Sequence, residues 1–286
     1  MPGTGPSTRS GYGLIALDLD GTLLDSRARI SAGNAAAIRA CHAAGVRVTL
    51  ATGKLLAATR GMCRDLGITG PQITANGAVI INVLPEEVLH VDPLPVAGYQ
   101  AAMAALAEYG LPMAAYTPFA IHTPHPDPRL DVLVAIHEPP PLVVPDIATR
   151  AAMDGAPFVK VLTVLEQGRP ETPAIEAALC ARFAPALTVV RTSALFIEFL
   201  APRVDKGRAL RRLAALLGVP MARVLAIGDS YNDLALLQAA GLGVAMANAP
   251  PEVQAIADAV TLDNDHDGVA AAIYRYVLPG VAPSGV

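Results

Sequence analysis

The sequence predicts an α/β protein, with a parallel-sheet core that is interrupted by an inserted α+β module. Strand-like and helix-like segments alternate at short spacing from residue 13 to 81, as they do in βαβ units. The alternation is lost from about 85 to 192, where prolines cluster, and it returns after that region. A hydrophobic share of 53% and a charged share of 16% support a sizeable buried core.

The first part of the core begins with an apolar run that starts at Gly13 and leads into Asp18 and Asp20. A helix is predicted over 31–44, with Ser31 as its N-cap and a glycine just past its end. A β-branched strand over 46–51 and a second helix over 55–66 follow. Residues 73–81 bracket Asn76-Gly77, which predicts a hairpin turn.

The middle of the chain has helix candidates over 96–109 and 173–183 and strand candidates over 158–165 and 187–191. The core pattern then resumes with helices over 206–217, 233–240 and 269–277 and strands over 224–227 and 243–246. We therefore expect the core at residues 12–84 and 193–286 and the insert at 85–192. A disordered tail rich in Gly, Pro, Ser and Thr is expected over 1–11.

Composition and charge exclude several classes of partner. The 21 basic and 25 acidic residues give a formal charge of −4, so no strong positive field would attract nucleic acid or an anionic membrane. No apolar run approaches the ~18 residues of a membrane span, and no signal peptide is evident. The three cysteines form no CxxC pair, which fits a reducing compartment. We expect a cytoplasmic protein with a small-molecule partner; its oligomeric state is not readable from the sequence.

Asp18 and Asp20 are the first candidate functional residues. They lie at the end of the first strand and precede Gly21 and Thr22, and ligands bind at the carboxyl ends of strands in open α/β sheets. Adjacent carboxylates repel each other, so a fold that places them there normally supplies a cation. A cluster of oxygen ligands suits a hard ion, above all Mg²⁺. For this segment alone, a solvated Asp-rich turn is the alternative.

Two weaker signals lie further along the chain. Thr52-Gly53 ends the next predicted strand, where a hydroxyl and backbone N–H groups suit a phosphate oxygen, although Thr-Gly is also an ordinary turn. Lys206 lies at a helix start, where its charge adds to the positive end of the helix dipole, as an anion site requires. An ordinary surface lysine is the alternative.

The last cluster is the segment from Asp229 to Asp233, which follows a buried strand and opens a helix. Asp229 would lie at a strand end, as Asp18 does. Asn232 and Asp233 would add a ligand or orient one from behind. The alternative is an Asp or Ser N-cap for the following helix, which suits Ser230 better than it suits the whole cluster.

Taken together and in this order, the four segments resemble the haloacid dehalogenase superfamily of phosphotransferases. The segments that match its four motifs, in order, are Asp18-x-Asp20-Gly21-Thr22, Thr52, Lys206 and Asp229 to Asp233. The Asn76-Gly77-Ala78 segment and the insert resemble the Cof-type branch, with its class IIB cap. The first and fourth motifs are specific, whereas the second and third carry weight only through their order. The resemblance covers residues 14–277 and implies a Rossmann-like parallel sheet core with an inserted α+β cap domain.

The resemblance also implies a magnesium-dependent phosphatase that works in two steps. Asp18 would attack phosphorus and form an aspartyl-phosphate, while Asp20 would protonate the leaving alcohol and then activate water. Mg²⁺ would bridge Asp18, the backbone carbonyl of Asp20, and Asp229. The residues implied to bind phosphate or substrate are Thr52, Gly53, Lys206 and Asn232, with Asp233 orienting the metal ligands.

The substrate is expected to be a small phosphate ester, such as a sugar phosphate, because in this branch the cap closes over the site and excludes large molecules. A phosphomutase on the same scaffold and a non-enzymatic binding protein on a retained fold are the alternatives, and the intact acidic set disfavours the second. Lys54 stands where the branch usually has arginine, and lysine loses the bidentate fork. Contacts made from that position in relatives therefore do not carry over.

Two further patterns resemble metal-binding sites, but we interpret both as structural. The Asp263 to Gly268 segment resembles the start of an EF-hand loop, but Tyr274 occupies the position of the bidentate glutamate, so we expect Asp267 to be a helix N-cap. His122, His125 and His137 lack further ligands at metal-site spacing and are expected to be exposed loop histidines.

Overall fold

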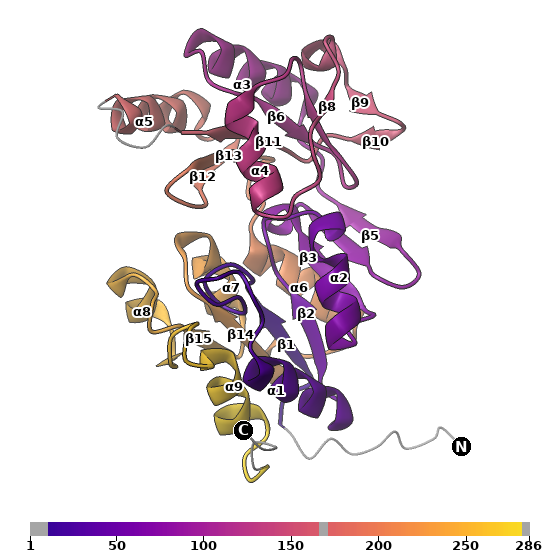
Figure 1. The fold of residues 1–286 in the computed structure, drawn as a ribbon, viewed down its shortest axis with the longest axis vertical. Helices are drawn as coiled ribbons and strands as arrows, with labels where there is room; N and C mark the ends of the chain where they lie inside the picture. The colour runs from indigo at the N-terminus through magenta and orange to yellow at the C-terminus, as the bar shows by residue number, and fades with distance from the viewer. Residues whose placement is uncertain (1–10, 166–170, 282–286) are drawn as a thin grey trace.

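The computed structural model describes residues 11–165 and 171–281, so the tail expected over 1–11 lies outside the described residues except for Gly11. Two modules are stacked along the longest axis (Figure 1). The lower module combines early and late parts of the chain, and the upper module is built mostly from its middle. The prediction of a parallel-sheet core with an inserted α+β cap is confirmed.

The core sheet has five strands in the order β16-β15-β14-β1-β2, and every neighbouring pair is parallel. The strands are β1 (Leu14–Leu17), β2 (Arg47–Leu50), β14 (Val224–Gly228), β15 (Leu242–Ala245) and β16 (Ala259–Val260). Leu17 at the end of β1 lies opposite Ile227 on one side and Leu50 on the other. The loops that leave β1, β2 and β14 therefore share one edge of the sheet.

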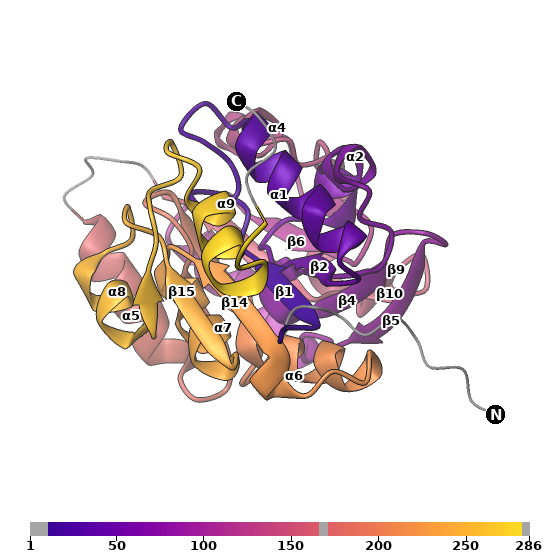
Figure 2. The same ribbon diagram turned by 90° about the horizontal axis from the view of Figure 1, so that it is seen from below.

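Helices cover both faces of this sheet, as the view from below shows (Figure 2). One face carries α1 (Ala32–Ala43), α2 (Leu56–Leu66) and α9 (Gly268–Ala272), and the other carries α6 (Lys206–Leu216), α7 (Leu234–Ala239) and α8 (Pro251–Ile256). Alternate residues of β1 serve the two faces. Ile15 and Leu17 pack with α1 and α9, whereas Leu14 and Ala16 pack with α6 and α7.

A three-stranded antiparallel sheet extends the core toward the upper module. Its strands are β3 (Pro71–Thr74), β4 (Val79–Asn82) and β5 (Glu87–Val91). The hairpin around Asn76-Gly77 is confirmed, and both residues adopt the positive φ that a tight turn needs, at 54° and 98°. A parallel bridge between Ala51 and Ile73 joins this sheet to the end of β2.

The cap is built on a six-stranded sheet in the order β12-β13-β11-β6-β7-β8. Its strands are β6 (Ala114–Tyr116), β7 (Ile121–Thr123), β8 (Leu142–Val143), β11 (Lys160–Val164), β12 (Thr188–Arg191) and β13 (Phe196–Leu200). All pairs are antiparallel except β7 with β8. A small hairpin, β9 (Ala152–Met153) with β10 (Ala156–Pro157), lies beside it.

The pairing of strands does not follow the module boundaries expected at residues 85 and 192. β5 pairs with β4 of the core, and β13 pairs with β11 and β12 of the cap. Backbone hydrogen bonds therefore tie residues 87–91 to the core and residues 196–200 to the cap. We propose boundaries near residues 92 and 201.

The two faces of the cap sheet have different roles. Helices α3 (Val96–Glu108) and α5 (Thr172–Phe183) pack on one face, against side chains such as Val161 and Phe199. The alternate positions on these strands belong to a second cluster that includes Leu162 and Leu200 and is shared with residues of the core. The short helix α4 (Asp131–Ala135) supplies Leu133 to that second cluster.

Some local details differ from the sequence expectations. The helix expected over 269–277 is α9 followed by one π-helical turn, Ile273–Val277. Asp267 does occupy the N-cap position of α9, but its φ is 58° and its side chain makes no capping bond. Its carboxylate instead accepts a hydrogen bond from Ser31 Oγ, and Ser31 caps α1 as expected. Within the described ranges, no helix is long and apolar enough to cross a membrane.

Candidate active site

Asp18 and Asp229 lie next to each other because they follow neighbouring parallel strands, β1 and β14. The backbone N–H of Asp18 donates to the carbonyl of Ile227 at 2.9 Å, which continues the ladder to this point. Gly21 turns the chain away with a φ of 81°, and a Cβ at that position would overlap the Asp229 carboxylate. Thr22 Oγ1 donates to Asp229 Oδ1 at 2.7 Å and fixes that side chain.

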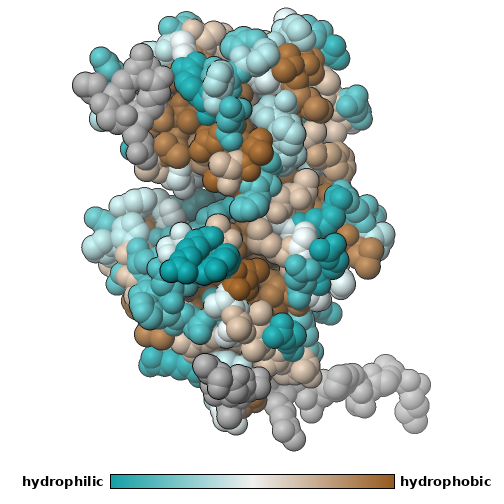
Figure 3. Space-filling view, viewed as in Figure 1, coloured by the Kyte–Doolittle hydropathy of each residue, from teal (hydrophilic) through white to brown (hydrophobic). Residues whose placement is uncertain are grey.

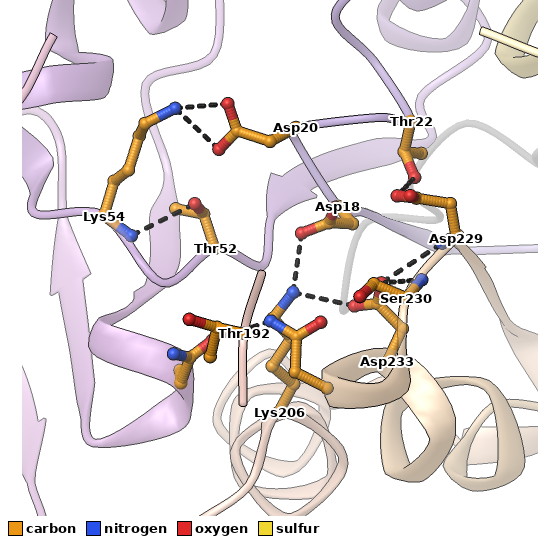
Figure 4. A network of polar contacts seen from close by, with 12 residues as sticks. Asp18, Asp20, Thr22, Thr52, Lys54, Thr192, Lys206, Asp229, Ser230 and Asp233 are labelled. Carbon is orange, nitrogen blue, oxygen red and sulfur yellow. Dashed lines mark hydrogen bonds and ion pairs between the residues drawn. The ribbon is translucent and has the colours of Figure 1, made fainter. Parts of the chain in front are cut away.

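Lys206 lies at the centre of the acidic cluster (Figure 4). Its Nζ donates to Asp18 Oδ1 at 2.6 Å and to Asp233 Oδ1 at 2.7 Å. The side chain is buried, so the alternative of an ordinary surface lysine is wrong. Burial alone would lower the pKa of Lys206, but Asp18 and Asp233 outweigh it and raise that pKa above the ordinary value.

The carboxylates are crowded enough to favour a cation. Burial, and then repulsion from Asp233, raises the pKa of Asp18 well above its usual range, against the pull of Lys206. The same two causes raise the pKa of Asp229 to about 6. Oxygen atoms of Asp18, Asp229 and Asp233 all lie within 4.8 Å of one another. Three clustered carboxylates, of which Asp18 and Asp233 share one lysine, fit a hard divalent cation such as Mg²⁺.

Asp233 is occupied on both oxygens. Besides the bond to Lys206, its Oδ2 accepts from the backbone N–H groups of Asp229 and Ser230, each at 3.1 Å. This arrangement caps the turn Tyr231–Asp233 that leads into α7. The N-cap interpretation of the segment is thus correct for Ser230, and it coexists with a cluster that orients Asp229.

Asp20 points away from Asp18, toward the loop after β2 (Figure 4). Lys54 Nζ donates to both of its carboxylate oxygens, at 2.6 Å to Oδ2. Lys54 is buried whereas the Asp20 side chain is 58% exposed. The Lys54 backbone N–H in turn donates to Thr52 Oγ1 at 3.2 Å. Lysine at position 54 therefore makes a direct contact with the expected acid/base.

One cavity of about 420 Å³ connects these residues with the cap. Its core wall includes Asp18, Asp20 and Asp229, and a recess between the two modules is visible on the surface (Figure 3). The cap wall is largely apolar, with Leu133, Ile136, Leu162, Leu195 and Phe196 among its lining residues.

A buried polar network crosses from the cap to the core. Lys160 Nζ donates to Glu198 Oε2 at 2.9 Å and to the carbonyl of Gly53 at 2.8 Å. Asn76 Nδ2 donates to the same glutamate oxygen at 2.8 Å, and Asn232 Nδ2 donates to Asn76 Oδ1 at 3.1 Å. The network thus links the expected phosphate-binding residues Gly53 and Asn232 to the cap sheet.

Sequence reasoning missed Lys160, Glu198, Glu138 and Tyr116, although a signal existed for two of them. Lys160 and Glu198 each interrupt a run of apolar residues that forms a buried strand. The chain also has only three lysines, and all three are buried: Lys54 and Lys160 line this cavity, and Lys206 binds Asp18 in its wall. The exposed basic side chains of this sequence are arginines, so the presence of a lysine indicates a residue of the site.

The other metal-like patterns do not assemble. Across residues 11–165 and 171–281, the only group of three or more His, Cys, Asp or Glu placed to hold an ion is Asp18, Asp229 and Asp233. His122 is buried within strand β7 of the cap, so the expectation of an exposed loop histidine is wrong for this residue. Asp263 accepts from His266 Nδ1 at 2.6 Å, and Asp265 accepts from the backbone of Ser26 at 2.8 Å.

Comparison with known proteins places this geometry in a family. A family model described as haloacid dehalogenase-like hydrolase matches residues 15–273. Phosphatase YwpJ of Bacillus subtilis is 33% identical over 278 residues, which cover 90% of this chain and 97% of that protein. The 5-amino-6-(5-phospho-D-ribitylamino)uracil phosphatase YcsE of the same organism is 32% identical over 269 residues, covering 93% and 96%.

Solved structures agree with this placement. A haloacid dehalogenase-like hydrolase from Bacteroides thetaiotaomicron superposes with a TM-score of 0.80 at 32% identity, covering 92% of this chain and 99% of that one. A haloacid dehalogenase-like hydrolase from Bacillus subtilis superposes with a TM-score of 0.81 at 31% identity, covering 91% and 98%. YwpJ and YcsE, the two relatives compared above, are both named phosphatases. The chain therefore belongs to the haloacid dehalogenase-like hydrolase family.

Proposed function

We propose that this protein is a Mg²⁺-dependent phosphatase that hydrolyses a small phosphorylated metabolite, such as a sugar phosphate, through an aspartyl-phosphate on Asp18. The observation that carries the proposal is Lys206 Nζ held between Asp18 and Asp233, with Asp229 alongside, at the core end of the cavity. A nucleophilic carboxylate beside a fixed cation is the arrangement that phosphoryl transfer requires.

The reaction divides between Asp18 and Asp20. An Asp18 oxygen forms a bond to phosphorus while the ester P–O bond breaks, and protonated Asp20 gives its proton to the leaving alcohol oxygen. Water then attacks the phosphorus of the aspartyl-phosphate and gives a proton to the Asp20 carboxylate, while the bond between phosphorus and the Asp18 oxygen breaks. The second step releases inorganic phosphate and restores both side chains. Lys54, which binds both Asp20 oxygens, would position this acid/base.

The metal would be held by Asp18, Asp229 and the backbone carbonyl of Asp20, with Asp233 orienting Asp229 through the backbone bonds described above. When bound, Mg²⁺ would neutralise charge on the phosphoryl group and on the carboxylates. The cluster of oxygen ligands and the raised pKa values of Asp18 and Asp229 support this assignment.

Phosphate oxygens would be bound by Thr52, Gly53, Lys206 and Asn232. Thr52 is buried at the end of β2, and Asn232 lines the cavity with its Nδ2 fixed by Asn76. The cap wall lies over this site, and a cavity of this kind favours a small molecule over a macromolecular substrate. A cytoplasmic location is supported by Cys41, Cys63 and Cys180, which are all free thiols.

The proposal is tested by measuring free phosphate from a panel of phosphate esters, with p-nitrophenyl phosphate included. Activity should require Mg²⁺ after dialysis against EDTA, and Asp18→Asn should abolish it. Asp65→Asn, at an exposed position on α2, is the matched control and should retain activity. Phosphate release that survives in Asp18→Asn would overturn the assignment of the nucleophile.

The same assay separates hydrolysis from phosphomutase activity. With glucose 6-phosphate, a phosphatase yields glucose and phosphate in equal amounts, whereas a mutase yields an isomeric sugar phosphate and little free phosphate. Product analysis by NMR distinguishes the two outcomes.

A further inference from the structure

Glu138 is a buried carboxylate that the proposed mechanism does not use. It follows α4 in the cap, lines the cavity and is only 5% exposed. Both of its oxygens accept one hydrogen bond from the backbone N–H of Leu55, at 3.3 Å. Among the residues that the structure describes, no Lys, Arg or His side chain lies within ion-pair distance of it. An ionised carboxylate that is buried without an ion-pair partner is costly, so a carboxyl group at this place beside a cavity points to a cationic ligand that would offset its charge.

Glu198, the other carboxylate of the cap wall, provides the contrast. It accepts from Lys160, Asn76 and Thr192, at 2.9, 2.8 and 3.1 Å. Its charge is balanced and its oxygens are occupied. Of the two carboxylates in the cap wall, Glu138 is therefore the one that can accept hydrogen bonds from a ligand.

Tyr116 is a second underused polar group in the same wall. It lines the cavity, and its Oη is buried with no hydrogen-bond partner among the described residues. Burial, followed by the charges of Glu138 and Glu198, raises the pKa of Tyr116 well above its usual value, which indicates a neutral hydroxyl near both carboxylates. Lys160 lies over the Tyr116 ring, with Nζ 4.2 Å from its centroid, and leaves the hydroxyl free.

The charges at the cap end of the cavity favour a cation. Glu138 and Glu198 face a single lysine there, Lys160, because Lys54 is bound to Asp20. The remaining cap wall is largely apolar, with Thr192 and Ser193 as its other polar residues, and suits the carbon skeleton of a ligand whose phosphoryl group would occupy the core end. A ligand that carries an ammonium group at the far end from its phosphate would satisfy Glu138 and Tyr116 together.

We propose that the alcohol portion of the substrate carries a protonated amine, which binds to Glu138 and Tyr116 at the cap end of the cavity. The substrate class is then a phosphorylated amino alcohol or amino sugar. This inference rests on the proposed phosphatase function, and it assigns the cap residues that recognise the substrate.

The experiment compares matched esters that differ only in the polar end group. ω-Aminoalkyl phosphates and ω-hydroxyalkyl phosphates of equal chain length form one series, and glucosamine 6-phosphate with glucose 6-phosphate forms a second pair. The readout is the ratio of kcat/KM for the amino ester over its hydroxyl partner. We expect a ratio of about ten or more at the best chain length, since a charge-assisted hydrogen bond contributes roughly that factor.

Two substitutions test the residues. Glu138→Gln keeps the shape and removes the charge, and should bring the ratio at the best chain length close to one. Tyr116→Phe should lower it by a smaller factor. Glu176→Gln, on the outer surface of the cap where it pairs with Arg191, is the matched control and should leave the ratio unchanged. Because the ratio compares two substrates on one protein, general damage to the fold cancels.

Binding of non-hydrolysable ω-aminoalkylphosphonates, measured by calorimetry against the corresponding alkylphosphonates, gives a readout independent of turnover. A ratio at or below one at every chain length, or a preference that survives in Glu138→Gln, overturns the inference while phosphate release from p-nitrophenyl phosphate upholds the phosphatase. If no ester releases phosphate, the proposed function itself fails.

Discussion

Replacing Glu138 by glutamine is expected to stabilise the protein above neutral pH and to have little effect near pH 4. Burial, opposed by Lys160 and by the Leu55 backbone N–H, raises the pKa of Glu138 from 4.5 to about 7. Lys54 also lowers this pKa and Glu198 raises it, so all the neighbouring charges are included in the net value. The folded protein therefore holds the proton more tightly than the unfolded chain does.

The sign and size of the effect follow from this difference. As pH rises from 4.5 to about 7, the unfolded chain releases the Glu138 proton first, so increasing pH favours unfolding. A pKa that moves from 4.5 to about 7 corresponds to about 3 kcal/mol, at about 1.4 kcal/mol for each tenfold change in proton affinity. Above pH 7 the cost is constant, and below pH 4.5 it vanishes. Glutamine has no such cost at any pH.

The assay is urea unfolding of wild type and Glu138→Gln at pH 5 and pH 8, with Glu176→Gln as the surface control. The stability gained by Glu138→Gln should grow by about 2 to 3 kcal/mol between the two pH values, whereas the control should show no such growth. A gain that is equal at pH 5 and pH 8, or a loss of stability at pH 8, would refute the view that Glu138 is a buried carboxyl group without an ion-pair partner.

Three further outcomes are expected. Lys206→Met leaves Asp18 and Asp233 without their cation and should reduce the free energy of unfolding by about 3 kcal/mol or more, whereas Arg208→Met, at an exposed position on α6, should change it little in the same urea assay. Lys54→Met should lower kcat for alkyl phosphates about tenfold more than for p-nitrophenyl phosphate, because a good leaving group needs less protonation by Asp20; equal losses would contradict the positioning role. Mg²⁺ should raise the melting temperature of wild type but not of an Asp229→Asn variant, as measured by calorimetry.

The core strands and the polar residues that follow them were predictable, because each can be recognised from a short stretch of sequence. Each strand of the parallel sheet is a short apolar run followed at once by a polar residue, so Asp18 and Asp229 are visible in sequence without knowledge of pairing. Parallel pairing of β1 with β14 then brings them together. Thr52 and Lys206 lie between Asp18 and Asp229 in the sequence, and this order completed the resemblance to the four motifs of the haloacid dehalogenase superfamily.

The cap half of the site was not predictable in the same way. Glu138 comes after a short helix, Tyr116 ends a three-residue strand, and Glu198 lies beyond the expected boundary of the cap. Their convergence depends on the antiparallel register of strands that are distant in sequence. For the same reason Lys54 was recognised only as a departure from the family, and its contact with Asp20 required the fold.

The contacts of the cap residues imply that the position of the cap affects the position of Asp20. Lys160 binds the carbonyl of Gly53, and Glu138 binds the N–H of Leu55, so the cap contacts the backbone on both sides of Lys54. Lys54 in turn holds the Asp20 carboxylate. The position of Asp20, the proposed acid/base, therefore depends on the cap through one short segment of loop. An ammonium group that binds Glu138 would compete with the Leu55 contact, and recognition at the far end of the substrate would thereby reach the proton donor at the other end.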